Sequence, residues 1–81
     1  MNINRDLKRK SVPELYPHWF AALADAGLSE GEVQRLRSSF ERDDGLVYYE
    51  VSFVSGTTEY EYSIDPNTAA VLHVERENAY D

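Results

Sequence analysis

The chain has 81 residues, with 15 acidic and 8 basic side chains, and a formal net charge of −7. This length indicates one small domain, and the absence of cysteine excludes disulfides and thiolate metal sites. No apolar run reaches the roughly 18 residues of a transmembrane helix, so no membrane insertion is expected. The acidic excess disfavours direct nucleic-acid binding and favours a basic partner.

The first ten residues have the opposite charge, with four basic residues and one acidic residue. We predict that residues 1–10 form a flexible basic leader, because polar termini with few apolar residues seldom pack. No apolar stretch of signal-peptide type follows them, so the chain as written is expected to stay in the cytoplasm.

A helix is predicted to begin at Ser11, where the sequence has a capping pattern, and to end at Gly27. Glycine at that position favours a left-handed C-terminal cap. Leu28 is expected to make the hydrophobic contact of a Schellman ending. Pro17 is expected to kink the first turn or to mark the start of the regular helix. The apolar stripe of this helix comprises Leu15, Trp19, Ala22, Leu23 and Ala26.

Residues 29–32 (SEGE) form a second capping pattern and predict one helical turn. Residues 34–42 alternate in polarity and predict a strand. A helix remains the alternative for this segment, because Val33, Leu36 and Phe40 also suit one helical face.

Residues 43–65 predict a β-hairpin, because both halves alternate with a period of two around Ser55-Gly56. The inward face is expected to comprise Val47, Tyr49, Val51, Phe53, Tyr60, Tyr62 and Ile64. The outward face is expected to comprise Tyr48, Glu50, Ser52, Glu59, Glu61 and Ser63. A turn at 65–68 and a short strand at 70–75 complete the single domain, 11–76, and residues 77–81 are predicted to be a frayed tail.

Four motifs, in this order and spacing, resemble the PepSY domain family of peptidase propeptides and YpeB-type proteins. They are Ala26-Gly27-Leu28, Arg42-Asp43-Asp44-Gly45, Tyr49-Glu50-Val51-Ser52-Phe53 and Glu59-Tyr60-Glu61-Tyr62-Ser63-Ile64-Asp65. The resemblance covers about residues 11–76. It implies an α+β fold, with one main N-terminal helix packed across a three- to four-stranded antiparallel sheet. It also implies a non-catalytic role, such as restraining a peptidase, often in secreted or envelope-attached proteins.

The chain departs from the family pattern at Ala69, where the family has glycine after threonine. We therefore expect the last turn to differ from the family's turn or to avoid a positive φ. The helix also departs, because it contains Pro17, His18 and Trp19. The family transfers no catalytic residues to this sequence.

The strongest candidate site is the outward face of the hairpin, an acidic platform containing Tyr48, Glu50, Ser52, Glu59 and Glu61. The structural alternative is that Arg35 and Arg37 on the neighbouring strand offset these acids by ordinary cross-strand pairing.

A second candidate is an aromatic patch at Tyr16 and Phe20, whose alternative role is to cover the rim of the sheet. His18 and His73 are too few for a zinc site, and Asp43-Asp44 fits a turn better than a calcium loop. We therefore predict no catalytic, metal or cofactor site.

These features predict a non-catalytic protein-binding module that inhibits or regulates a partner such as a peptidase, and not an enzyme. The alternative is a small acidic mimic of nucleic acid, like phage-encoded inhibitors of nucleases or of CRISPR effectors, because acids along strands imitate phosphates. The domain is expected to be a monomer or a weak edge-strand dimer.

Overall fold

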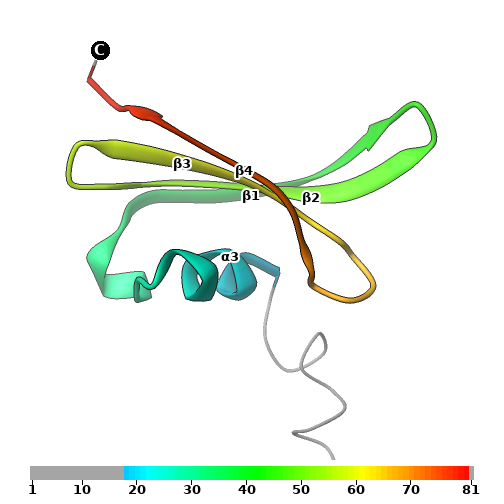
Figure 1. The fold of residues 1–81 in the computed structure, drawn as a ribbon, viewed down its shortest axis with the longest axis horizontal. Coiled ribbons are helices and arrows are strands. Elements are labelled where there is room, and N and C mark those ends of the chain that lie inside the picture. Colours follow the sequence, from blue (N-terminus) through cyan, green and yellow to red (C-terminus); the bar gives the residue numbers. More distant parts are fainter. Residues whose placement is uncertain (1–17, 81) are drawn as a thin grey trace, which may run out of the picture.

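The computed structural model describes residues 18–80, in which one helix lies across one face of a four-stranded sheet (Figure 1). The elements are α3 (His18–Ala26), η1 (Glu30–Glu32), β1 (Gln34–Asp43), β2 (Leu46–Ser55), β3 (Thr58–Ile64) and β4 (Val71–Asn78). This arrangement confirms the predicted α+β fold. The basic leader and the predicted helix start at Ser11 lie outside the described residues.

The four strands form an antiparallel meander in the order β1-β2-β3-β4. Asp44 and Gly45 both have positive φ, 53° and 81°, as a type I′ turn between β1 and β2 requires. Gly56, with a φ of 64°, occupies the first loop position between β2 and β3, where a type II′ turn needs glycine. The hairpin predicted at 43–65 is therefore confirmed.

The end of α3 follows the predicted Schellman geometry. Gly27 has a φ of 76° and donates its N–H to the carbonyl of Ala24 at 3.1 Å. Leu28 donates its N–H to the carbonyl of Leu23 at 3.0 Å. These two hydrogen bonds turn the chain sharply towards η1, where the N–H of Ser29 donates to Oε1 of Glu32 at 2.8 Å.

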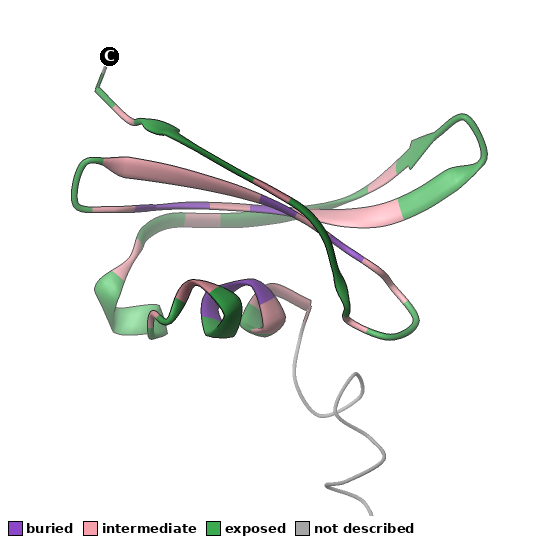
Figure 2. Ribbon diagram, in the orientation of Figure 1, coloured by how far each residue is buried: buried purple, intermediate pink, exposed green. Residues whose placement is uncertain are grey.

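The core lies between α3 and the middle of the sheet (Figure 2). It comprises Ala22, Leu23, Val51, Phe53, Tyr62 and Ile64. Tyr62 is fully buried, its ring packs on Phe53, and its hydroxyl donates to Oδ2 of Asp25 at 3.0 Å. Burial and this hydrogen bond raise the pKa of Tyr62 to about 12.

The expected inward face is buried only at its centre. Val47 is 36 % exposed, and Tyr49 and Tyr60 are half-buried. The physical reason is the length of α3: nine residues extend about 13 Å, which is shorter than β1 or β2. Val47, towards the β1–β2 turn, therefore lies beyond the reach of the helix, whereas the ring of Tyr49 is partly covered by His18 at the start of α3.

The segment predicted at 34–42 is a strand, as expected, and the helical alternative is wrong. Its pairing with β2 shifts between Gln34 and Arg37, so that Arg35 and Leu36 together face one residue of β2. Arg35 has a φ of 59° at this bulge. Leu36 remains packed against the core on the inward face.

The last strand is longer than the predicted 70–75. β4 continues to Asn78, so Glu77 and Asn78, which the sequence assigned to the tail, pair with Glu59 and Thr58 of β3. The following residue, Ala79, donates its N–H to the carbonyl of Thr57 at 2.8 Å. Pairing with β3 and its turn therefore holds this part of the chain in register.

Of the two expectations for the turn at Ala69, the avoidance of a positive φ is wrong, because Ala69 has a φ of 65°. The loop holds it there: Asp65 accepts the N–H of Asn67 at 2.7 Å on its side chain and the N–H of Ala69 at 2.9 Å on its carbonyl. The N–H of Asp65 in turn donates to the carbonyl of Ala70 at 2.9 Å. These hydrogen bonds stabilise a conformation that alanine alone disfavours.

We expect A69G to stabilise the domain, because glycine adopts a positive φ without the penalty that Cβ imposes. The expected gain in unfolding free energy is about 0.5–1 kcal/mol, or a few degrees in Tm, by calorimetry. The control A24G, on the exposed side of α3, should lower Tm instead. An unchanged or lower Tm for A69G would contradict this account of the turn.

We expect Y62F to lower the free energy of unfolding by about 1–2 kcal/mol at neutral pH, because it removes a hydrogen bond to a carboxylate. The folded-state pKa of Tyr62 is raised, so its contribution is complete below about pH 10 and is lost as pH rises towards 12. Urea unfolding should therefore show the difference from wild type narrowing in that range. Y80F, at a residue that is 67 % exposed, is the control and should match wild type at neutral pH.

Candidate functional site

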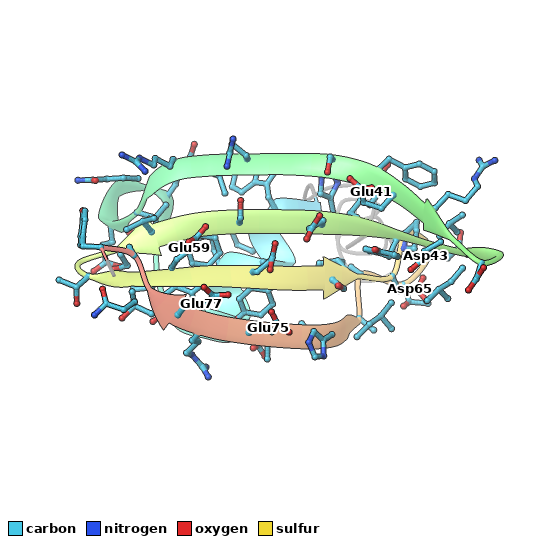
Figure 3. All side chains as sticks on the ribbon, turned by 90° about the horizontal axis from the view of Figure 1, so that it is seen from above. Glu41, Asp43, Glu59, Asp65, Glu75 and Glu77 are labelled. Carbon is cyan, nitrogen blue, oxygen red and sulfur yellow. The ribbon has the colours of Figure 1, made fainter. Side chains whose placement is uncertain are left out.

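The face of the sheet opposite α3 is acidic across all four strands; we call it the outer face. Figure 3 shows Glu59, Glu75 and Glu77 over β3 and β4, with Glu41 and Asp43 towards the β1–β2 turn. The strand register places Glu59 directly opposite Glu77, and Glu61 directly opposite Glu75. We call Glu59, Glu61, Glu75 and Glu77 the glutamate quartet.

All five outward residues predicted from the hairpin lie on this face. The register sets Glu61 opposite Ser52, Glu59 opposite Val54, and Glu50 opposite Ser63. Tyr48 lies at the β1 side, opposite Glu41. The structure thus brings Tyr48, Glu50, Ser52, Glu59 and Glu61 onto one surface.

Sequence reasoning missed the contribution of β4, which supplies Glu75 and Glu77 to the outer face. The predicted strand stopped at Glu75, and no face was assigned to it. The signal was the alternation of His73, Glu75 and Glu77, which has the period of a strand with one charged face.

The structural alternative, that Arg35 and Arg37 offset the acids, is not observed within residues 18–80. There the ion pair within 4 Å joins Nε2 of His73 to Oε2 of Glu75, at 3.2 Å. Arg35 and Arg37 line a small depression together with Glu59, without such an ion pair. Arg76, between Glu75 and Glu77 in the sequence, lies on the inward side over the ring of Tyr60, so among residues 18–80 the base paired with the quartet is His73.

A shallow depression of about 270 Å³ lies where β1, β2 and β3 meet on the outer face. It is lined by Arg37, Ser38, Ser39, Glu50, Ser52 and Glu61. Its side chains are hydroxyls, carboxylates and one guanidinium, and it is open to solvent. These groups suit the binding of polar or basic side chains of a partner.

Glu50 and Glu61 interact at the centre of the face. A hydrogen bond with Glu50, then burial, then the charges of Glu50 and Glu75 raise the pKa of Glu61, while His73 lowers it. Burial also raises the pKa of Tyr48, and nearby acids raise it further. Those acids are Asp43, Glu50, Glu41 and Glu61.

We expect E61Q to raise Tm at neutral pH, because it replaces carboxylate repulsion by an amide that can donate to Glu50. Removing one cross-strand repulsion is worth roughly 0.2–1 kcal/mol. Because the folded-state pKa of Glu61 is raised, the wild type loses stability as pH rises through it, so the gain should vanish at about pH 4. Calorimetry at pH 7 and at about pH 4 measures the two Tm values. The control D44N, at the exposed turn, should change neither of them. A gain in Tm for E61Q at both pH values would contradict the proposed repulsion.

The aromatic candidate is only partly within the described chain. Tyr16 lies outside the described residues. Phe20 is 42 % exposed on α3, and its ring meets Trp19 edge-on at 6.4 Å. Phe20 therefore lies near the helix side of the domain, away from the acidic outer face (Figure 1).

The two histidines lie on opposite sides of the sheet. His18 stacks on Tyr49 with ring centroids 3.6 Å apart, and burial lowers its pKa. His73 lies on the outer face next to Glu75. Within residues 18–80, no group of three or more histidine, cysteine or acidic residues has a metal-binding arrangement, and no helix is long and apolar enough to cross a membrane.

One helix on a four-stranded antiparallel meander, with an acidic open face, defines a small α+β domain. The chain belongs to the PepSY family: the family model described as "Peptidase propeptide and YPEB domain" matches residues 23–75. The resemblance of the four motifs is thereby confirmed.

A curated relative carries no functional description. The chain is 33 % identical over 60 residues to "Uncharacterized protein Spy1430" of Streptococcus pyogenes serotype M6 (strain ATCC BAA-946 / MGAS10394). The match covers 74 % of this chain and 46 % of the relative, so the chain spans about half the length of the protein it matches. No solved structure matches the chain.

Proposed function

We propose that this domain is a non-catalytic protein-binding module whose outer face binds a basic surface of a partner and thereby inhibits or regulates it. A peptidase is the partner class that the family description suggests. The observation that carries the proposal is the glutamate quartet, in which two pairs of like charges face each other across β3 and β4.

The quartet has an energetic cost to the free domain. Directly opposed side chains on antiparallel strands lie about 4.5–5.5 Å apart, and like charges at that separation destabilise the sheet. A partner that presents lysine or arginine side chains relieves this repulsion on binding. The free energy lost in the isolated domain is then recovered in the complex.

The sheet also makes the quartet a well-defined surface for recognition. The four carboxylates project from two strands whose pairing is regular from Thr58 to Ser63, so their spacing is set by the backbone. A rigid acidic surface speeds encounter with a basic partner and disfavours acidic ones. This arrangement supports binding without chemistry at the site.

The test uses E59Q/E77Q, in which one opposed pair is neutralised at almost constant shape. Binding to purified thermolysin-like metallopeptidases, and inhibition of their activity, should weaken roughly tenfold relative to wild type, while Tm should rise slightly. E30Q/D44N removes the same number of charges at exposed positions off the quartet, and it should bind like wild type.

Two results would contradict the proposal. One is an absence of binding and inhibition at micromolar concentrations of the domain. The other is binding that E59Q/E77Q leaves unchanged. If the domain instead displaces nucleic acid from a basic channel, with a steep loss of affinity in salt, the acidic-mimic alternative is favoured over the peptidase partner.

A further inference from the structure

The outer edge of β1 is a free strand edge with an ordered distribution of charge. β1 is the first strand of the sheet, and within residues 18–80 no other strand pairs with its outer edge. From Arg37 to Asp43 its pairing with β2 is regular, so this part of the strand has no bulge. Such an edge presents backbone N–H and C=O groups that a further strand can pair with.

The charges on β1 are separated along the strand. Arg35 and Arg37 lie at its first end, and Glu41 and Asp43 lie at its last end. Arg37 shares the outer face with Glu41, because their partners Ser52 and Tyr48 lie on that face. On its outer face β1 is thus positive at the first end and negative at the last end, because Arg42 pairs with Val47 on the inward face.

We infer that two copies of this chain pair through their β1 edges, antiparallel and related by a two-fold axis at Ser39. In this register Arg37 of each copy lies opposite Glu41 of the other, because both are equally distant from Ser39. Opposite charges facing across antiparallel strands stabilise the pairing.

The inward face of β1 favours the same register. Phe40 is 50 % exposed at the edge, and its ring is held by an edge-on contact with Tyr49 at 5.2 Å. Across the two-fold axis, Phe40 lies opposite Ser38 of the other copy and diagonal to the second Phe40. The pairing therefore covers two exposed aromatic rings as well as two strand edges.

The edge of β4 does not offer the same match. Its outer face carries His73, Glu75 and Glu77, so any antiparallel pairing of two β4 strands brings an excess of acids together. Its pairing with β3 is also irregular between Ser63 and Ile64. The charge pattern therefore selects β1 as the self-complementary edge.

The dimer has consequences beyond the proposed function and does not depend on it. The two-fold axis is perpendicular to the sheet, so both helices lie on one face and both glutamate quartets lie on the other. The product is a continuous eight-stranded sheet with two acidic surfaces. A partner with two basic regions would bind it with higher avidity than it binds a single domain.

Sedimentation equilibrium on the full chain, from about 1 µM to about 1 mM, tests the inference. Wild type should self-associate to a dimer. R37E should weaken the dimer roughly tenfold, because symmetry converts two attractive pairs into repulsive ones. R37E/E41R, which has the net charge of wild type, should restore the dimer, because opposite charges again face each other across the two copies.

Disulfide cross-linking tests the same contact independently, with variants that leave every charged side chain in place. The chain has no cysteine, so S39C introduces a single thiol at the proposed axis. Opposed residues on antiparallel strands have a Cα separation compatible with a disulfide, so S39C should oxidise rapidly to a covalent dimer. N78C, at the end of β4, is the control and should oxidise slowly.

A monomer at the highest concentration, or a dimer that R37E leaves intact, would overturn the inference. So would faster cross-linking of N78C than of S39C, because that result would locate the contact at β4. Binding of an extended segment of another protein to β1 in place of a second copy would overturn it as well.

Discussion

The burial of Tyr62 between α3 and the sheet is the constraint on which the rest of the structure depends. Its ring fills the centre of the core beside Phe53, and its hydroxyl reaches Asp25 on the helix. This side chain therefore joins the helix to β3 both by packing and by a hydrogen bond. A buried phenol hydroxyl without a hydrogen-bond partner would destabilise the fold, so the hydrogen bond also favours this position of α3 on the sheet.

The short helix divides the sheet into surfaces with different tasks. Burial of Leu23, Val51 and Ile64 concentrates the apolar contacts of the described chain at the centre of one face. Apart from Val54, the residues of the other face contribute little burial, so charged residues there do not disrupt the core. A small domain can therefore tolerate opposed glutamates on its outer face while the helix side supplies the stability.

Most of the fold was predictable because its signals are local. The alternation around Tyr49 and Tyr62 sets which side of each strand faces the core, and Gly27 needs only its own φ to end the helix. The conformation of Ala69 was not predictable from its own preference, since hydrogen bonds to Asp65 outweigh the cost of a positive φ. The alternation of His73, Glu75 and Glu77 indicated a longer β4, but its end was set by pairing with β3 as far as Thr58.

The candidate site was predictable in part for the same reason. The acids of the hairpin alternate visibly, so the outward direction of Glu59 and Glu61 follows from sequence. The pairing of each with a second glutamate is a property of register between β3 and β4, and only the structure supplies it. The distance of Arg35 and Arg37 from β4 likewise follows from the strand order, which places β1 and β4 at opposite edges.

The strand order therefore separates the bases at the start of β1 from the glutamates of β4, while Glu41 and Asp43 keep the other end of β1 acidic. The basic residues Arg35 and Arg37 lie at the β1 edge, and Glu75 and Glu77 lie at the β4 edge. A basic partner approaching this face is attracted by β3 and β4 and repelled near the start of β1. Binding of a partner over the quartet thus leaves the β1 edge open, and the two proposed contacts are compatible on one domain.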